Sequence, residues 1–266
     1  MKKEDKLQKL RSILAEAGSA VVALSGGTDS VFLAWVASEV KELRLLAVTV
    51  NSPYMFASEV SEAVSFCAGH GIDHRQIIMG IPDVVGNNPP ERCYLCKREV
   101  MNLITGEAVK AGFSYVFDGT NMDDVSDYRP GMRALKEFGV RSPLLEAGLS
   151  KEDIRALSRE AGLPTWDKPS NACLMTRFPH GTLISPEELR KAEAAEDILS
   201  GFGLKGSRVR VHGEVVRIEC RNEYMTSLLD EKLRAGITAK LKALGYSYIT
   251  VDLEGYRTGS MNRKIE

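Results

Sequence analysis

Two glycines end an apolar run near the N-terminus, in the stretch VVALSGGTDS (21–30). Glycine permits positive φ and lets backbone N–H groups approach an anion, since no Cβ stands in the way. A helix that begins near Thr28 would add unpaired N–H groups and the positive end of its dipole. The stretch therefore predicts a phosphate cradle made of Ser25, Gly26, Gly27, Asp29 and Ser30, with Asp29 also a candidate Mg²⁺ ligand. In the alternative interpretation, Thr28, Asp29 or Ser30 only caps a helix after a glycine turn.

Short apolar runs alternate with helical patterns through the first half of the chain. The expected strands are 19–24, 44–50, 74–79 and 113–118, and the expected helices are 30–41, 57–70 and 93–111. This alternation predicts an α/β fold with a doubly wound parallel sheet. Ligands of such sheets bind outside the carboxyl ends of the strands. SGGTDS and a second polar loop, DGTNMDD (118–124), both follow strands, so we expect them to meet in one crevice.

The chain has five cysteines, which are Cys67, Cys93, Cys96, Cys173 and Cys220. An odd, sparse set argues against a disulfide framework and for metal or catalytic roles. Cys67 and Cys220 lie in apolar patterns and are predicted to be small buried hydrophobes. Cys93 and Cys96 form a CxxC at the start of an expected helix, a motif that also occurs in redox and zinc sites. Cys173 lies in a loop, four residues before Arg177, where an exposed thiolate is expected.

A second, smaller α+β domain is expected after residue 168, which gives predicted domains of 1–168 and 169–266. Residues 151–164 form a helix that ends at Gly162 and Pro164, and 165–185 read as a loop or linker. Helix 186–200, strands 207–212 and 215–220, helix 224–244 and strand 246–252 are expected to follow.

The stretch SRVRVHGEVVRIE (207–219) predicts a hairpin with a Gly213-Glu214 turn. Counting outward from the turn, Arg210 faces Arg217 and Arg208 faces Glu219, so Arg208 and Glu219 can pair across the strands. Two arginines face to face destabilise a sheet unless an anion lies between them, and a nucleotide phosphate would serve. The alternative is that both arginines extend into water. Glu196 shares a helix face with apolar residues, which fits either a substrate contact or a partly exposed surface residue.

Composition excludes several classes of function. The formal net charge of −1 gives no general attraction to nucleic acids or acidic membranes. No apolar run approaches the roughly 20 residues of a membrane span. The charged N-terminus lacks the apolar core of a signal peptide, so a cytoplasmic location is expected. The sequence has no GxxxxGK[ST] motif, so it lacks a Walker A nucleotide site. It also has no GxGxxG motif, so it lacks the fingerprint of a dinucleotide-binding site.

SGGTDS resembles the pyrophosphate-binding loop of the PP-loop ATP pyrophosphatases, and DGTNMDD resembles their second nucleotide motif. That resemblance implies ATP as cofactor and the adenylation of a substrate oxygen. Nearly the whole chain is similar to the LarE family of ATP-dependent sulfur insertases, in ERCYLCK (91–97), GTNMDDVSDYRPGMRA (119–134), VRSPL (140–144), KPSNACLMTR (168–177) and the hairpin. This resemblance implies that ATP adenylates pyridinium-3,5-biscarboxylic acid mononucleotide with loss of pyrophosphate, and that sulfur then displaces AMP. The product would serve the synthesis of the nickel-pincer nucleotide cofactor of lactate racemase.

The resemblance also implies roles for individual residues. Those matching the family's site are Lys97, Asp124 and Cys173 for catalysis, Gly119 and Thr120 for the nucleotide, and Glu196, Arg208 and Arg210 for the substrate, to which the hairpin argument adds Arg217. Three-cysteine members of the family are of the cluster type, which implies a [4Fe–4S] cluster on Cys93, Cys96 and Cys173. Single-cysteine members instead sacrifice a cysteine sulfur and form dehydroalanine. The expected partners are a small nucleotide substrate, sulfide or a sulfur donor, and further copies of the chain in a homo-oligomer.

Two other functions remain open at this point. PP-loop enzymes that thiolate tRNA also use a CxxC with a third cysteine, although the balanced charge of this chain speaks against a nucleic-acid partner. A non-catalytic ATP-binding module with structural zinc would need a fourth metal ligand, for which His180 is the candidate near the cysteines.

Overall fold

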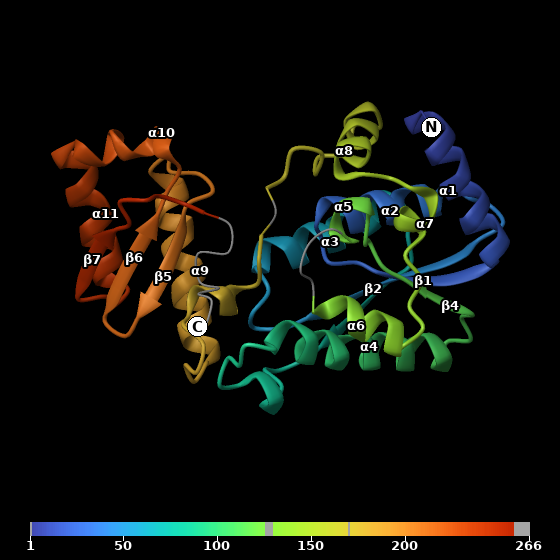
Figure 1. The fold of residues 1–266 in the computed structure, drawn as a ribbon, viewed down its shortest axis with the longest axis horizontal. Helices are drawn as coiled ribbons and strands as arrows, with labels where there is room; N and C mark the ends of the chain where they lie inside the picture. Colours follow the sequence, from blue (N-terminus) through green and yellow to red (C-terminus); the bar gives the residue numbers. More distant parts are fainter. Residues whose placement is uncertain (1, 126–129, 170, 258–266) are drawn as a thin grey trace. The chain divides into compact units, whose positions relative to one another are not determined.

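The computed structural model describes residues 2–125, 130–169 and 171–257 (Figure 1). The chain forms two compact units. Unit 1 comprises residues 1–85 and 90–171, and unit 2 comprises residues 86–89 and 172–266. The short segment 86–89 therefore packs with unit 2, although the chain on both sides of it belongs to unit 1. The assignment of separate functions to the two units stays a prediction.

Unit 1 is built on a parallel sheet with strand order β3-β2-β1-β4. The strands are β1 Ser19–Ala23, β2 Arg44–Asn51, β3 His74–Ile78 and β4 Tyr115–Phe117, and they alternate with α2 Thr28–Ser38, α3 Ala57–Gly69 and α4 Arg92–Lys110. The predicted α/β fold is thereby confirmed.

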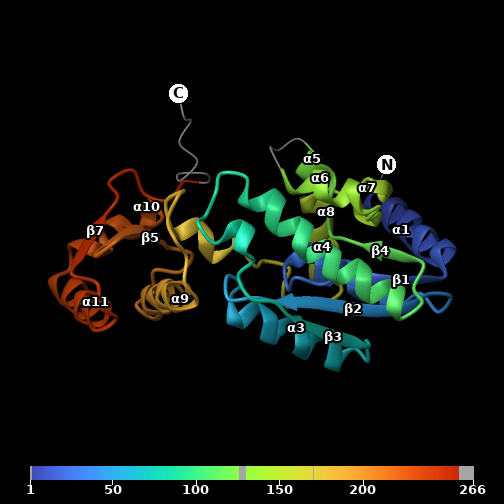
Figure 2. The same ribbon diagram turned by 90° about the horizontal axis from the view of Figure 1, so that it is seen from below.

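Helices cover both faces of this sheet, because successive side chains of a buried strand point to opposite sides. Val21 of β1 packs in one core with Met101 and Ile104 of α4, together with α6 (Gly131–Glu137). The alternate residues of β1 pack in a second core with helices α1 (Lys3–Ala17), α2, α3 and α8 (Lys151–Glu160). Figure 2 shows α4 and α3 on opposite sides of the strands. The sheet is doubly wound, as predicted.

Three short elements complete unit 1, and the sequence patterns did not predict them: η1 Asp83–Val85, α5 Met122–Val125 and α7 Pro143–Ala147. Helix α8 was predicted, and it begins with a capping box in which Ser150 and Asp153 exchange hydrogen bonds. Its C-terminal turn is followed by Gly162 at φ +70°. No helix within the described ranges is both long and apolar enough to span a bilayer.

Unit 2 contains a three-stranded sheet in which β5 (Arg208–His212) and β6 (Val215–Glu219) are antiparallel. Strand β7 (Tyr248–Val251) is parallel to β6. The predicted hairpin register is confirmed, with Arg210 opposite Arg217. The helical elements are η2 Leu174–Arg177, α9 Pro186–Gly201, α10 Asn222–Met225, η3 Ser227–Leu229 and α11 Glu231–Ala243.

The prediction of one helix over 224–244 is wrong. The structure ends α10 and η3 before Asp230 and begins α11 after it. The side chain of Asp230 accepts a hydrogen bond of 2.6 Å from the N–H of Leu233. An aspartate with extended backbone is a favourable N-cap, so the chain begins a new helix at this residue.

Candidate nucleotide and substrate sites

The first polar loop brings backbone N–H groups to the end of strand β1. Gly26 has φ +79°, and a Cβ at this position would lie 2.5 Å from the carbonyl oxygen of Glu59 in α3. Only glycine avoids both the strain and the clash. Gly27 has φ −79°, so only Gly26 of the two uses the positive φ that glycine permits. Gly27 is the N-cap of α2, which excludes the alternative of a side-chain N-cap at Thr28, Asp29 or Ser30.

Hydroxyl groups fix the shape of this loop. The Oγ of Ser30 accepts a 3.2 Å hydrogen bond from the N–H of Ser25 and lies 3.1 Å from the Ser25 Oγ. The hydroxyl of Thr28 donates to the carbonyl of Thr165 at 2.8 Å. Lys168 Nζ donates to the carbonyl of Gly26 at 3.1 Å. The segment 165–168 therefore supports the loop from outside, a role that the sequence patterns did not reveal.

The second polar loop packs directly on the start of α2. A Cβ at Gly119 would lie 2.9 Å from the backbone nitrogen of Ser30. Asp118, 5% exposed, accepts hydrogen bonds of 2.6 Å from the hydroxyls of both Thr120 and Ser142. Sequence reasoning did not assign Asp118 a role, although it is the first residue of DGTNMDD. The predicted meeting of the two loops is confirmed.

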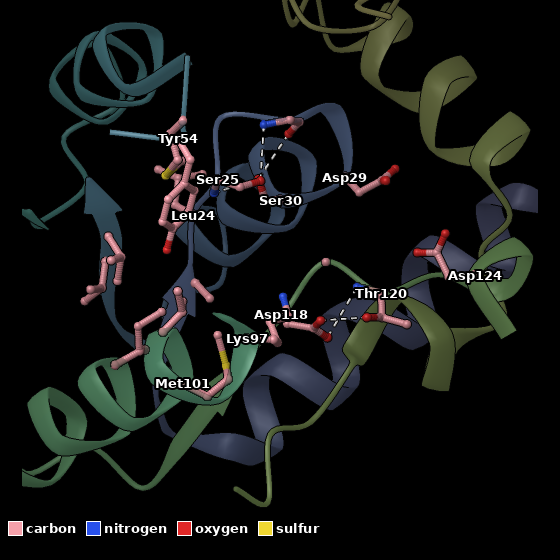
Figure 3. Close-up of a pocket in the computed structure, with 18 residues that line it drawn as sticks. Leu24, Ser25, Asp29, Ser30, Tyr54, Lys97, Met101, Asp118, Thr120 and Asp124 are labelled. Atoms are coloured by element: carbon pink, nitrogen blue, oxygen red, sulfur yellow. Dashed lines mark hydrogen bonds between the residues drawn. The ribbon is translucent and has the colours of Figure 1, made fainter. Parts of the chain in front are cut away.

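Both loops line one pocket of about 290 Å³ (Figure 3). Its polar wall contains Ser25, Gly27, Asp29, Ser30, Asp118, Gly119, Thr120 and Asp124. Its apolar wall includes Val48, Val50, Val100, Met101 and Ile104. Tyr54 and Lys97 also line the pocket. An apolar surface with a few convergent polar groups is what a purine nucleotide requires.

Lys97 and Asp124 reach this pocket from different helices. Lys97 lies on α4 and brings a positive charge to it. Asp124 lies on α5, is 3% exposed, accepts from the N–H of Asn121 at 3.2 Å, and forms an ion pair with Lys151 at 3.0 Å. Within residues 2–125, 130–169 and 171–257, no group of three or more His, Cys, Asp or Glu side chains is arranged to hold a metal ion. The Mg²⁺ role of Asp29 stays a prediction.

The CxxC lies at the first turn of α4, as predicted. Cys93 is exposed and Cys96 is partly buried. The Cys96 thiol donates to the hydroxyl of Tyr54 at 3.1 Å. Because Tyr54 also lines the pocket, the CxxC helix is connected to it through a residue that sequence reasoning missed.

The prediction that Cys67 and Cys220 are buried is confirmed, with 1% and 0% exposure. Burial raises the pKa of the Cys67 thiol to about 11, because the thiolate is poorly solvated in the core. Burial also raises the pKa of the Cys220 thiol. Both thiols are therefore protonated and unreactive near neutral pH.

Cys173 belongs to unit 2, where it is the N-cap of η2 and is partly buried. Arg177, 1% exposed, donates to both carboxylate oxygens of Glu196 at 2.8 and 2.9 Å. It also donates to the carbonyl of Ala172 at 2.9 Å. The Glu196 carboxylate thus balances the arginine that was expected to make the surroundings of Cys173 electropositive.

Glu196 is a buried hydrogen-bond centre rather than a surface residue. It is 8% exposed and accepts a 3.1 Å hydrogen bond from the N–H of Val209. Arg208 lies beside it at 3.8 Å. Burial lowers the pKa of Arg208, and the nearby charges of Arg177 and Arg210 lower it further while Glu196 opposes them.

Arg208 and Glu219 face each other across the hairpin, as predicted, but the carboxylate turns to other arginines. Glu219, 0% exposed, instead pairs with Arg210 at 2.7 Å and with Arg217 at 3.1 Å. The two facing arginines are therefore bridged by an anion, but that anion is the protein's own carboxylate. Arg217 also lies 3.4 Å from Asp252. The alternative of two arginines extended into water is wrong for Arg210, which is 5% exposed.

The chain is similar to known proteins over nearly its whole length. No family model matches it. It is 34% identical to pyridinium-3,5-bisthiocarboxylic acid mononucleotide synthase of Lactiplantibacillus plantarum over 91% of this chain and 88% of that protein. It is 38% identical to an uncharacterised protein of Synechocystis over 98% of both chains.

A third similarity is confined to part of the chain. It is 26% identical to one subunit of the glutamine-hydrolysing GMP synthase of Thermoplasma volcanium, over 57% of this chain and 54% of that protein. The partial match to GMP synthase supports the PP-loop fold. The match to the synthase from Lactiplantibacillus covers 91% of this chain and therefore extends over both units. The chain therefore belongs to the LarE family, the family of pyridinium-3,5-bisthiocarboxylic acid mononucleotide synthase.

Proposed function

We propose that this protein is an ATP-dependent sulfurtransferase. It converts the carboxylates of pyridinium-3,5-biscarboxylic acid mononucleotide to thiocarboxylates, which the nickel-pincer cofactor of lactate racemase requires. The observation that carries the proposal is the pocket of unit 1, which two glycine-containing loops and an apolar wall line together, in a chain that matches the synthase over both units.

ATP would bind with its base on the apolar wall and its phosphates at the start of α2. There the backbone N–H groups and the Lys97 ammonium stabilise the negative charge of the β,γ-pair. A substrate carboxylate oxygen attacks the α-phosphorus, and the bond from that phosphorus to the α,β-bridging oxygen breaks, so that pyrophosphate leaves. The products of this step are an acyl adenylate and pyrophosphate, not ADP. Asp29 lines the pocket and is the residue that would hold a Mg²⁺ ion, which would neutralise the leaving group.

Sulfur would then displace AMP from the adenylate. A sulfur nucleophile attacks the acyl carbon, the C–S bond forms, and the C–O bond to AMP breaks. Asn171 donates to the Glu59 carboxylate at 3.2 Å, beside the phosphate loop. Cys173 follows two residues later, and two residues span at most about 7 Å. Cys173 is thus separated by only two positions from a residue that contacts α3, which supports its role in delivery.

Cys93, Cys96 and Cys173 are the residues that would hold a [4Fe–4S] cluster. All three are free of disulfides and at least partly accessible, which fits thiolate donors. Three thiolates without a fourth suit a cluster with one open iron better than closed tetrahedral zinc. When bound, the cluster would supply an iron on which an additional sulfide can be carried. The alternative is that Cys173 gives up its own sulfur and becomes dehydroalanine.

The substrate's phosphate would meet the arginine network of unit 2. The side chain of Arg217 is 29% exposed, against 6% for Arg210 and 8% for Arg208. Arg217 is therefore the most accessible first contact for an anion. Glu196 would orient Arg208 through their ion pair. Arg210 is already bonded to Glu219 and to the carbonyl of Thr176, so its contribution would be mainly to hold the network together.

The deciding experiment measures AMP and pyrophosphate after anaerobic incubation with ATP and the pyridinium substrate. We expect stoichiometric release of both, and its loss in Asp29→Ala with the fold intact. Asp83→Ala, which removes an exposed carboxylate away from the pocket, is the matched control. Full adenylation by Asp29→Ala would exclude its metal role, and tRNA binding would favour the tRNA-thiolating alternative.

Analysis of the metal and sulfur content separates the remaining possibilities. Iron and sulfide in the anaerobically purified protein, with no loss of mass after turnover, are expected for the cluster. A protein without iron whose Cys173 becomes lighter by one H₂S would overturn the cluster assignment. Zinc without turnover would favour the ATP-binding module. A homo-oligomer and a cytoplasmic location remain expectations of the proposal.

A further inference from the structure

We infer that Asn88 is a positioning residue that clasps the turn after Cys173 onto the segment leading into the CxxC. This inference deepens the proposed function and rests on it, because it assigns the cysteines one shared task. Its starting point is the segment 86–89, which packs within unit 2 while the residues on both sides of it belong to unit 1.

The side chain of Asn88 makes an unusual set of contacts. It is 0% exposed, and its amide nitrogen lies 2.9 Å from the carbonyl of Pro179, 3.0 Å from that of Phe178 and 3.3 Å from that of Met175. Two N–H groups are thus shared among three carbonyl oxygens. The Met175 carbonyl lies within η2 and also accepts from the N–H of Phe178 at 3.3 Å, whereas the carbonyls of Phe178 and Pro179 follow the last residue of η2. The amide of Asn88 therefore closes the turn whose N-cap is Cys173.

The backbone of the same segment adds to this clasp. The carbonyl of Asn88 accepts from the N–H of Gly181 at 3.2 Å and from Nδ1 of His180 at 3.2 Å. The carbonyl of Gly86 accepts from the N–H of Ile184 at 2.8 Å. Segment 86–89 is therefore fixed to residues 175–184 through both its side chain and its main chain.

Asn88 also carries backbone strain. Its φ is +50°, and it is the one non-glycine residue with positive φ in the part of the chain that the structure describes. Asparagine tolerates this conformation better than most residues, and such strain persists where the surrounding contacts over-determine it. Glycine would adopt the same backbone at lower cost but would lack the amide. The position therefore requires the amide as well as the conformation.

The clasp connects two cysteine-bearing segments. Cys93 follows Asn88 by five residues, which span at most about 18 Å. Cys173 begins the turn that the Asn88 amide closes. Fixing the turn to residue 88 therefore limits how far the chain allows the CxxC and Cys173 to separate. Without the amide, both segments keep their cysteines, but the turn after Cys173 loses its side-chain link to residue 88 and keeps the main-chain hydrogen bonds of residues 181 and 184.

Cobalt(II) is a suitable probe, because each thiolate bound to it adds sulfur-to-cobalt charge-transfer absorption. The full-length apoprotein is titrated with Co²⁺ under anaerobic conditions. The intensity is calibrated with Cys173→Ser, which removes one of the three thiolates and is expected to lower it by about one third. The test variant is Asn88→Gly, which accommodates the positive φ and deletes the amide. Asn87→Gly, at an exposed neighbouring asparagine, is the matched control.

We expect Asn88→Gly to fall to the intensity of Cys173→Ser, and Asn87→Gly to keep that of the wild type. Asn88→Asp, which keeps the size and removes both donors, should behave like Asn88→Gly. Cooperative thermal unfolding of each variant excludes a general loss of structure. Wild-type intensity in Asn88→Gly and Asn88→Asp would overturn the inference. Wild-type intensity in Cys173→Ser would instead overturn the shared three-cysteine site, and the positioning role would fall with it.

Discussion

The proposed nucleotide pocket of unit 1 and the arginine network of unit 2 differ in the groups that each offers to a negative charge. The pocket offers backbone N–H groups at the start of α2, where Gly26 approaches Glu59 and Gly119 approaches Ser30 at distances that a Cβ would block. The network uses guanidinium groups at the ends of long side chains, held by Glu196 and Glu219.

This difference affects how each region responds to change. Backbone donors are fixed by the path of the chain, so they persist whatever partners the side chains choose. Guanidinium groups depend on buried carboxylates, and removing one carboxylate leaves an uncompensated charge. We therefore expect unit 2 to be more sensitive to loss of charge and unit 1 to added volume at glycine. Both tryptophans, Trp35 and Trp166, lie in unit 1, so their fluorescence follows that unit during unfolding.

The largest effect is expected for Glu219→Gln. The substitution keeps the volume and removes the carboxylate that bridges Arg210 and Arg217. Breaking a buried ion pair costs about 3–5 kcal/mol of the free energy of unfolding. Urea unfolding of the variant, followed by circular dichroism, should show an early transition that tryptophan fluorescence does not report. Glu214→Gln, at the exposed hairpin turn, should match the wild type.

A double variant separates the structural role of Arg210 from substrate binding. Replacing a whole buried ion pair by apolar residues is often neutral for stability. Arg210→Met combined with Glu219→Met should therefore recover much of the stability that Glu219→Gln loses. If this stable double variant binds the nucleotide substrate more weakly than the wild type, Arg210 also binds substrate. If both the stability and the substrate affinity match the wild type, the role of Arg210 is only to hold the network together.

The next largest effect is expected for Gly26→Ala. The new Cβ would lie 2.5 Å from a backbone carbonyl, at φ +79°. Positive φ alone costs an alanine about 1–2 kcal/mol, and the clash raises the total to about 2–4 kcal/mol. In contrast to Glu219→Gln, this variant should unfold at lower urea concentration when unfolding is followed by tryptophan fluorescence. Calorimetry should show loss of ATP binding. Gly69→Ala, which has no atom within 4 Å of its new Cβ, should keep both properties; equal loss there would contradict the close-approach argument.

The smallest effect is expected from the titration of Cys67, which is buried in the core that contains α2 and α3. Its pKa is about 11 in the folded protein against an ordinary value of 9.0. The unfolded state therefore loses its proton first as the pH rises, so stability is fully present below pH 9 and falls toward pH 11. Two pKa units correspond to about 2–3 kcal/mol. Subtracting the pH profile of Cys67→Ala from that of the wild type should isolate this loss, and identical profiles would exclude it.

Much of unit 1 could be predicted from the sequence because local patterns determine it. Continuous apolar runs mark strands buried on both faces, and glycine with hydroxyl residues marks the turn from β1 into α2. Parallel topology then brings both polar loops to one edge of the sheet. The hairpin register of unit 2 followed in the same way from its two-residue turn.

The partners of long side chains could not be predicted, because they depend on elements distant in the sequence. Strand register placed Arg208 opposite Glu219, but the carboxylate turns to Arg210 and Arg217, while Arg177 and Arg208 meet Glu196 from α9. Tyr54 likewise reaches Cys96 across 42 positions, and Asn88 reaches Pro179 across 91. Sequence alone determined the backbone and the loops that phosphate chemistry needs. Only the tertiary structure decided which charged groups and amides interact. The reason is that a buried polar group must form its hydrogen bonds with whichever groups pack against it.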